Sequence, residues 1–326
     1  MCSGSPKLDL PVIDLSLLPS YLKGESQEPK TPSELQKLGE ACENLGFFRV
    51  INHGIDPTLI KTMDSVARDM FTLPTEVKER AISPIFNSGY TPPDLNPVGK
   101  DSMPESMVLT GVMGSSSFED ISHKLWPQGN HLFCETVPAY NSKMTELAHR
   151  LTKLIIQSLG LNVSECYTSA SFDKCKGWLR LNCYHTDDAL SDEPITCKAH
   201  TDVGFLTVLY EDEVGGLQIR TKEGKWIDAK PLPGSFIVNI SDCLKMWTNA
   251  KYRSAEHRVM YGGKKNRRLS VAFFFDVEDH IQIRSPPQLI DEQHPRLYKP
   301  VTFGDIKSYY HRNGPTMEGA PTYYMN

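Results

Sequence analysis

Short β-prone segments separated by turn residues dominate the sequence from residue 177 onward. Each segment is four to seven residues long, and glycine, proline and aspartate are frequent between them. This rhythm is typical of an all-β sandwich or barrel, and we expect a double-sheet jelly roll. The predicted strands are residues 178–184, 205–210, 217–221, 225–229, 235–240, 258–261, 269–275 and 280–283.

Helices are expected outside this β-region. Apolar residues recur at three- and four-residue steps in residues 33–45 and 136–159, and glycine follows each pattern. Further helices are expected at 57–71 and 303–311, and short strands at 10–15 and 47–51. We therefore predict a mainly β fold with flanking helices, in which residues 1–130 form an N-terminal α/β segment. Residues 131–326 would hold the long helix, the jelly-roll core and the C-terminal helix.

The composition is that of an ordinary globular chain. Of its 326 residues, 39% are hydrophobic and 23% charged, and 35 basic against 40 acidic side chains give a net charge of −5. Mild acidity gives no reason to expect nucleic acid or an anionic membrane as a partner. The eight cysteines contain no C-x-x-C pair, and neither a secretory leader nor a membrane-spanning run is visible. We expect a cytoplasmic monomer.

One group of residues has the character of a metal site. His200 and Asp202 stand two positions apart, so they project to the same side of a strand or its end. His257, from a separate β-segment, can supply a third ligand. Two histidines and one carboxylate on one face of an octahedron leave three positions open, as non-haem iron(II) oxygenases require.

The sequence repeats the same tripeptide fifteen residues earlier, as His185-Thr186-Asp187. That copy runs into an acidic segment, residues 188–194, whereas His200 and Asp202 precede the apolar run 203–209. The apolar run can bury and stiffen a metal site. We therefore predict that the second copy binds the metal and that the first belongs to a loop.

Arg268 and Ser270 share one face of the predicted strand that follows His257. Arg268 opens the apolar run 271–275, where a buried guanidinium requires an anionic partner. A guanidinium and a hydroxyl suit the far carboxylate of a dicarboxylic acid. The alternative is a surface arginine in a basic hairpin with Lys264, Lys265 and Arg267.

The walls of a substrate pocket are less well defined. The proline-rich stretch 84–113, the strand around residue 275 and the C-terminal tail are the candidates. Their aromatic and methionine side chains favour a largely apolar small molecule, although each could equally be a core residue. The candidate residues are Phe86, Tyr90, Met107, Phe275 and Tyr309.

Taken together, the chain resembles plant-type 2-oxoglutarate- and iron(II)-dependent dioxygenases, the group that includes flavonoid, gibberellin and auxin oxidases. The resemblance covers nearly all of residues 1–326, which would form a single catalytic unit. The motifs that carry it are Leu10-Pro-Val-Ile-Asp14, Gly46-Phe-Phe-Arg-Val-Ile-Asn-His-Gly54, Asn182-Cys-Tyr184, His200-Thr-Asp202, Gly215-Gly-Leu-Gln218, Asn239-Ile-Ser-Asp242, Ser254 to Val259, Arg268-Leu-Ser270 and His294-Pro-Arg-Leu-Tyr298.

This resemblance implies a double-stranded β-helix, iron(II) bound by the three candidate ligands, and dioxygen and 2-oxoglutarate as cosubstrates. It implies that Asn182 and Tyr184 assist Arg268 and Ser270 in binding 2-oxoglutarate, and that ascorbate serves as reductant. Two positions depart from the family pattern: Ser241, and Ala250 after Trp247-Thr-Asn249, replace the usual glycines.

Three other functions are compatible with parts of the pattern. A non-catalytic small-molecule-binding β-barrel would need neither the metal ligands nor the arginine. A zinc hydrolase could use the same ligands but has no use for a dicarboxylate anchor. An iron enzyme could use a different reductant. Within the dioxygenase family, hydroxylation is the default outcome, and demethylation or desaturation begins with the same hydrogen abstraction.

Overall fold

A computed structural model describes residues 9–18, 33–84, 88–93, 104–110, 118–184, 195–260, 267–313 and 322–325. Its largest element is an eight-stranded sheet, in which only the β1–β2 pair is parallel. The strands follow the order β1 (Val12–Asp14), β2 (Phe47–Ile51), β10 (Phe236–Ile240), β7 (Leu206–Glu211), β12 (Arg268–Asp276), β5 (Lys176–Tyr184), β4 (Glu105–Leu109) and β3 (Gly89–Thr91).

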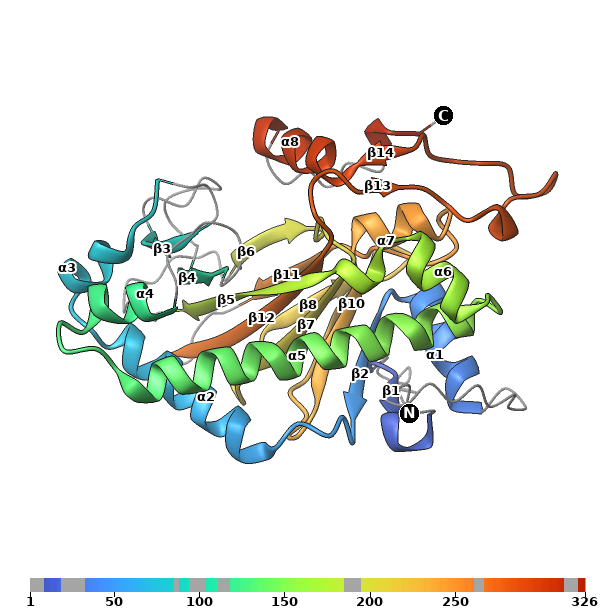
Figure 1. The fold of residues 1–326 in the computed structure, drawn as a ribbon. Coiled ribbons are helices and arrows are strands. Elements are labelled where there is room, and N and C mark those ends of the chain that lie inside the picture. Colours follow the sequence, from blue (N-terminus) through green and yellow to red (C-terminus); the bar gives the residue numbers. More distant parts are fainter. Residues whose placement is uncertain are drawn as a thin grey trace, which may run out of the picture.

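A second, four-stranded sheet accompanies the large one (Figure 1). Its order is β6 (Ile195–His200), β11 (His257–Met260), β8 (Leu217–Arg220) and β9 (Trp226–Asp228). The strands that the C-terminal half contributes to both sheets pair antiparallel, and the two sheets confirm the predicted mainly β, jelly-roll architecture. The remaining pair, β13 (Gln282–Ile283) and β14 (Val301–Thr302), lies apart from both.

The predicted helices are present, and the largest shift of a boundary is at the start of α5. α1 (Ser33–Asn44), α2 (Pro57–Phe71) and α8 (Phe303–Asn313) match the sequence patterns, while α5 (His131–Ser158) begins five residues before the predicted start at 136. Asn130 caps α5 by accepting from the backbone N–H of Phe133. The shorter helices are α3 (Thr75–Lys78), α4 (Phe118–Leu125), α6 (Val163–Ser169) and α7 (Asp242–Trp247).

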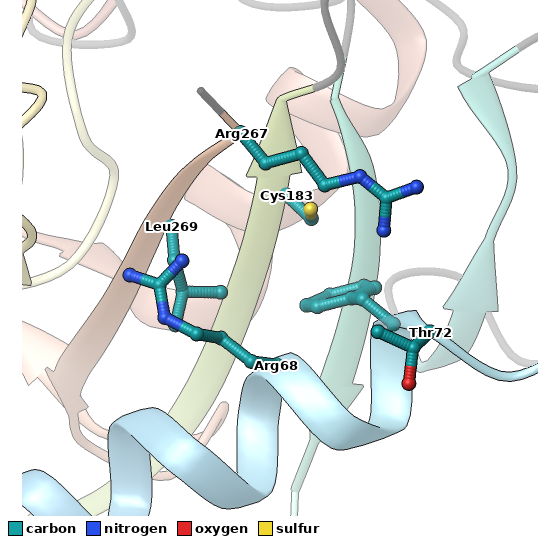
Figure 2. Close-up of a pocket in the computed structure, with 6 residues that line it drawn as sticks. Arg68, Thr72, Cys183, Arg267 and Leu269 are labelled. Carbon is teal, nitrogen blue, oxygen red and sulfur yellow. The ribbon is translucent and has the colours of Figure 1, made fainter. Parts of the chain in front are cut away.

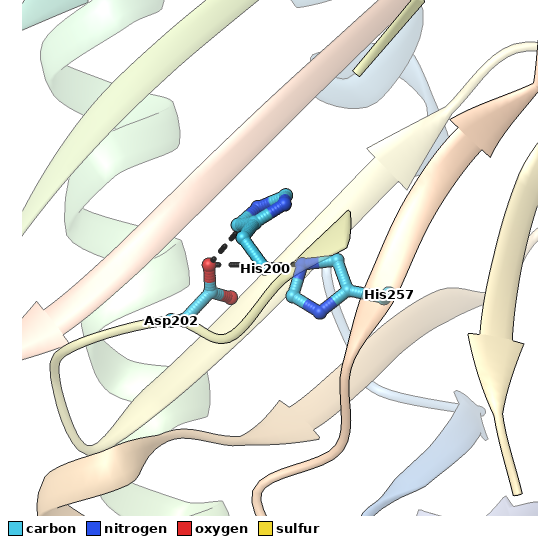
Figure 3. A group of neighbouring side chains, drawn as sticks. All are labelled: His200, Asp202 and His257. Atoms are coloured by element: carbon cyan, nitrogen blue, oxygen red, sulfur yellow. Dashed lines mark ion pairs between the residues drawn. The ribbon is translucent and has the colours of Figure 1, made fainter. Parts of the chain in front are cut away.

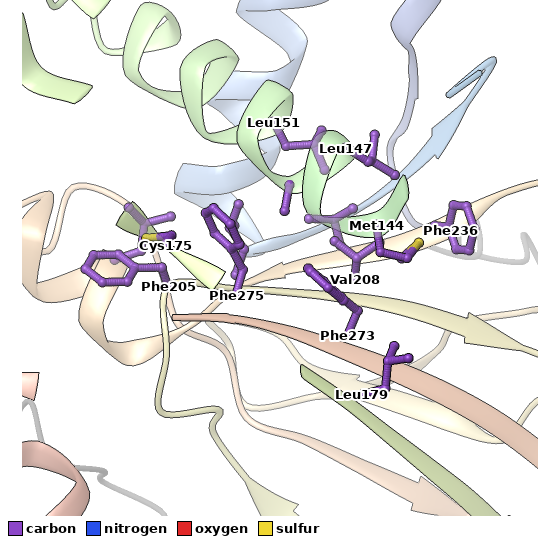
Figure 4. Packing of buried hydrophobic residues seen from close by; sticks show 14 of the residues in the cluster. Met144, Leu147, Leu151, Cys175, Leu179, Phe205, Val208, Phe236, Phe273 and Phe275 are labelled. Carbon is purple, nitrogen blue, oxygen red and sulfur yellow. The ribbon is translucent and has the colours of Figure 1, made fainter. Parts of the chain in front are cut away.

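The main hydrophobic core lies between α5 and the large sheet (Figure 4). Met144, Leu147 and Leu151 on α5 face Phe273 and Phe275 on β12. Odd-numbered residues of β12 therefore face the helix, because side chains alternate along a strand. Its even-numbered residues face the other way, into the space that the small sheet closes.

Strands of the N-terminal segment form part of the large sheet. β1 and β2 extend one edge of the large sheet, and β3 and β4 extend the other. β3 and β4 fall within the stretch that the sequence predicted as irregular. The division of the chain into two parts at residue 130 stays a prediction.

Among the described helices, none is both long and apolar enough to cross a membrane.

Candidate active site

Strand pairing brings the three candidate metal ligands together. His200 is the last residue of β6, and its backbone pairs in register with that of His257, the first residue of β11. Asp202 lies two residues beyond the end of β6. The two imidazole rings are 4.3 Å apart between centroids. The sheet register therefore fixes the separation of the two histidines.

The ligand atoms converge on one point (Figure 3). Oδ1 of Asp202 lies 3.8 Å from Nε2 of His200 and 3.7 Å from Nε2 of His257. One donor atom from each of the three residues lies within 4.8 Å of the others. This spacing suits a single cation bound on one face by two nitrogens and an oxygen.

Surrounding groups orient these ligands. Each histidine Nδ1 faces a backbone carbonyl, that of Lys198 at 2.8 Å for His200 and that of Ala255 at 3.2 Å for His257. An Nδ1–H that donates to the carbonyl leaves the Nε2 lone pair free for a metal. Such paired outer contacts are typical of metal-binding histidines.

Two side chains that the sequence analysis did not assign hold the carboxylate of Asp202. Its Oδ2 accepts from the hydroxyl of Thr207 at 2.6 Å and from the amide of Asn239 at 2.8 Å. These bonds turn Oδ1 toward the histidines. Asn239 stands in a family motif, so its position could have been flagged from sequence, whereas nothing in the sequence singles out Thr207.

The protonation states follow from burial and from the neighbouring charges. Burial, and then the nearby His200, lower the pKa of His257 to about 4, so its ring is neutral near neutral pH. Burial raises the pKa of Asp202, but the two histidines and two hydrogen bonds outweigh the effect of burial and hold this pKa below its usual value. Burial lowers the pKa of His200, yet Cys197 and Asp202 outweigh it and raise it to about 9. Without a cation, His200 is therefore protonated near neutral pH and Asp202 is ionised, and a metal bound through Nε2 of His200 would displace that proton.

The predicted 2-oxoglutarate residues form two facing pairs across β5 and β12. Arg268 pairs in register with Tyr184, and Ser270 with Asn182. The guanidinium lies over the Tyr184 ring, 4.7 Å from its centroid, and donates from Nη1 to Oγ of Ser270 at 3.2 Å. Its Nε donates to the carbonyl of Gly215 at 2.7 Å. A buried basic group, a hydroxyl and an amide thus share one surface.

Arg268 has an acidic partner that the sequence analysis missed. Nη2 of Arg268 lies 3.2 Å from Oε2 of Glu211, and the two side chains are 1% and 3% exposed. Glu211 is the last residue of β7 and pairs with Ser270 across the strands. Burial raises the pKa of Glu211, while Arg268 acts in the opposite direction. The buried arginine therefore does have an anionic partner, but within the protein.

One cavity of about 1060 Å³ contains both groups. The three candidate metal ligands and all four candidate 2-oxoglutarate residues line it, together with residues from both sheets and from α8. A cation bound at Asp202 and a dicarboxylate bound at Arg268 would therefore share one chamber.

Comparison with known proteins decides the family. The sequence profile of the 2OG-Fe(II) oxygenase superfamily matches residues 175–277, and that of the non-haem dioxygenase in morphine synthesis N-terminal domain matches residues 10–109. Jasmonate-induced oxygenase 3 of Arabidopsis thaliana is 31% identical, over 94% of this chain and 82% of the relative. The chain belongs to the 2-oxoglutarate- and iron(II)-dependent oxygenase superfamily.

Further relatives agree with this assignment. The 2-oxoglutarate-dependent dioxygenase DAO of Oryza sativa subsp. indica is 33% identical, over 92% of this chain and 93% of the relative. The crystal structure of the dioxygenase for auxin oxidation in rice has a TM-score of 0.80 at 31% identity, covering 97% of this chain and all of that one. The structure of JOX2 with 2OG, Fe and JA has a TM-score of 0.81 at 27% identity, covering 98% and 90%.

These findings confirm an iron(II)- and 2-oxoglutarate-dependent dioxygenase and support neither the binding-protein nor the hydrolase alternative.

The residues that line the cavity differ from the pocket-wall residues that the sequence predicted. Tyr90 lines the cavity, whereas Met107 and Phe275 are fully buried in the core and Tyr309 packs against other tyrosines beside it. Phe86, and the repeated His185 and Asp187, lie outside the described residues.

Strand alternation explains the error at Phe275. Arg268 and Ser270 face the cavity, so the even-numbered Ala272 and Phe274 do as well, and Phe275 must point toward α5. The periodicity used to pair Arg268 with Ser270 would have excluded Phe275. At the C-terminus, Tyr310 and not Tyr309 lines the cavity.

A second, much smaller pocket of about 140 Å³ lies between α2 and the strands β5 and β12 (Figure 2). Arg68, Cys183 and Arg267 contribute to its lining. Arg68 is already paired with Asp64 and Asp212. None of the seven residues assigned to iron or 2-oxoglutarate lines this pocket, so we assign it no part in the reaction.

Proposed function

We propose that this oxygenase hydroxylates a small, largely apolar plant metabolite or hormone, giving succinate and carbon dioxide from 2-oxoglutarate. His200, Asp202 and His257 would bind the iron. Arg268 and Ser270, assisted by Asn182 and Tyr184, would hold the far carboxylate of 2-oxoglutarate. The observation that carries the proposal is that all seven side chains line a single cavity.

Bound iron(II) supplies the oxidising chemistry in this family, using dioxygen and electrons from 2-oxoglutarate. The protein's own part is binding and orientation. Thr207 and Asn239 fix the carboxylate of Asp202, and the backbone carbonyls fix the two imidazoles. Arg268 and Ser270 set where the cosubstrate ends. No general base is required.

The relatives and the cavity walls support the proposed substrate class. The similar proteins include oxygenases named for jasmonate, gibberellin and auxin. Aromatic side chains, among them Tyr90, Trp178 and Phe274, line the cavity. Hydroxylation is the default outcome in the family, and demethylation and desaturation are the alternative products to look for. Ascorbate as reductant, a cytoplasmic location and a monomeric state belong to this proposal.

The test is substrate-stimulated release of succinate. Purified protein is supplied with iron(II), 2-oxoglutarate, ascorbate and one candidate hormone or metabolite at a time, and succinate and products are followed by mass spectrometry. We expect succinate in equal amount to a product that is 16 mass units heavier than its substrate. A product 2 units lighter would indicate desaturation. Absence of 2-oxoglutarate consumption with every candidate would count against the proposal.

A further inference from the structure

The turn that carries two of the metal ligands is held by a second buried carboxylate. Thr201, which stands between His200 and Asp202, donates from Oγ1 to Oδ2 of Asp242 at 3.0 Å. The backbone N–H of Asp242 donates to the carbonyl of Asp202 at 2.8 Å. Asp242 is the first residue of α7 and is 1% exposed. Its side chain and its backbone therefore both hold the segment between β6 and β7.

The same carboxylate oxygen contacts the C-terminal helix. Oδ2 of Asp242 also accepts a hydrogen bond from the hydroxyl of Tyr310 on α8. Two donors from segments that are far apart in the sequence thus meet on one buried oxygen. Neither Asp242 nor Tyr310 is among the seven residues assigned to iron or 2-oxoglutarate. The contact between them therefore links the metal-ligand turn to an element that the reaction has not yet used.

The helix α8 is anchored to the core mainly through its first half. It lies outside the two sheets, next to β14 (Figure 1). The side chains of Phe303 and Ile306, both in its first half, are buried. In its second half, the ring of Tyr310 lines the cavity while the hydroxyl reaches Asp242. This hydrogen bond attaches the second half of the helix to the metal-ligand turn.

One shared oxygen makes the two attachments interdependent. A buried carboxylate is costly unless hydrogen-bond donors satisfy it, and here Thr201 and Tyr310 satisfy the same atom of Asp242. Movement of α8 that withdraws the Tyr310 hydroxyl changes the bond that Asp242 forms with Thr201, and so changes the support of the turn. Coupling between two sites acts equally in both directions. A metal that orders the turn must therefore favour the docked helix.

We propose that Asp242 and Tyr310 are positioning residues that couple the docking of α8 to the geometry of the metal ligands. Neither residue has to touch the metal or the reacting atoms. A substrate that contacts the ring of Tyr310 acts through the same link, because this ring is part of the cavity wall. The proposal rests on the iron site of the proposed function and connects that site to the C-terminal helix.

Hydrogen–deuterium exchange tests the coupling from the side of the metal. Exchange of the α8 amides, residues 303–313, is followed by mass spectrometry in the full chain with manganese(II), a redox-stable substitute for iron(II), or with EDTA. We expect manganese(II) to slow this exchange about fivefold or more in the native protein. Tyr310→Phe removes only the hydroxyl and should abolish the effect. Tyr309→Phe, in a neighbour that packs against other tyrosines, is the matched control and should behave as the native protein does.

Metal affinity tests the coupling from the side of the helix. Electron paramagnetic resonance of the free ion gives the Kd for manganese(II). We expect Tyr310→Phe to weaken binding about fivefold or more, because the coupling is reciprocal. Asp242→Ala should weaken it by about 10–100-fold, the range for groups that hold metal ligands in place, and Asp242→Asn should recover part of the loss. Circular dichroism checks folding, and Tyr310→Phe decides the outcome if Asp242→Ala does not fold. A merely structural role would lower stability and leave this Kd unchanged.

Folded Tyr310→Phe protein with the native Kd for manganese(II) would overturn the inference. Native protein in which the metal does not change the exchange of α8 would overturn it too, as would an equal effect of the metal in Tyr310→Phe. The proposed function fails in a separate way, if iron-loaded protein consumes no 2-oxoglutarate. Exchange and metal binding are measured without turnover, so the two results are independent.

Discussion

At the scale of single residues, the site depends on which of two identical tripeptides binds the metal. Asp202→Ala removes the oxygen on which both histidines converge, while Asp187→Ala changes the matching position of the other copy. We expect succinate release to fall by more than about a hundredfold in Asp202→Ala, because loss of an outer-sphere contact alone costs 10–100-fold. Asp187→Ala should retain near-native turnover. The reverse pattern would show that the metal was assigned to the wrong copy.

Glu211 gives a second residue-scale prediction. Its carboxylate lies beside the guanidinium that would bind the far carboxylate of 2-oxoglutarate, so the two anions share one cation. Glu211→Gln keeps a hydrogen-bonding group and removes the charge. We expect KM for 2-oxoglutarate to fall by roughly three- to tenfold with kcat little changed, because repulsion between like charges is relieved. The exposed Glu213→Gln is the control, and a higher KM in Glu211→Gln would show that the negative charge is needed to position Arg268.

At this scale, the sequence predicted which residues take part in the site better than it predicted the side of a strand to which a side chain points. The metal ligands and the residues around Arg268 could be named because their types and spacings are specific. Glu211 could not, since its role arises from the pairing of β7 with β12, which is distant in sequence. Thr207 could not, since only the folded turn between β6 and β7 brings its hydroxyl to Asp202. Phe275 was misplaced because the aromatic character of the run was read without its alternation.

At the scale of elements, the turn after α7 carries backbone strain. Ala250, at one of the two positions that depart from the family pattern, has φ +62°, and Asn249 has φ +53°. This left-handed region is costly for residues other than glycine. Ser241, the other departure, has φ −101° and needs no glycine.

We therefore expect Ala250→Gly to raise the free energy of unfolding by about 0.5–1 kcal/mol, the relief of strain being partly offset by the greater freedom of the unfolded chain. Asn249→Gly is the matched change. It should destabilise the protein, because the Asn249 side chain bonds the backbone of Leu289, Pro295 and Leu297. Denaturant unfolding measures both variants. A destabilised Ala250→Gly protein would mean that the packing of the methyl group outweighs the strain.

Element boundaries show what local sequence can and cannot specify. The ends of α1 and α2 were predictable, since capping residues and apolar spacing act within one turn. The strand β6 was missed, although it carries His200, because it follows an acidic segment and its only apolar residues are Ile195, Cys197 and Ala199. The pairing of β6 with β11 is a tertiary property, and it fixes the separation of the two histidines.

At the scale of the whole molecule, the metal should stabilise the fold, because the site joins β6 and β11 and forms only in the native protein. A ligand at a hundredfold excess over its Kd adds about 2.7 kcal/mol. We expect manganese(II), used as a redox-stable substitute for iron, to raise Tm by about 4 °C or more, given ~2 °C per kcal/mol for a chain of this size. Scanning calorimetry with and without EDTA measures the shift. A similar shift in His257→Ala would show that the metal binds elsewhere.

The most direct test of the site assignment is an anomalous difference map at the iron absorption edge, from crystals grown without oxygen in iron(II) and 2-oxoglutarate. We expect one peak per chain, within bonding distance of Nε2 of His200, Oδ1 of Asp202 and Nε2 of His257. Electron density for the dicarboxylate should end at Arg268 and Ser270. Iron at His185 and Asp187, or a dicarboxylate held away from Arg268, would contradict the assignment.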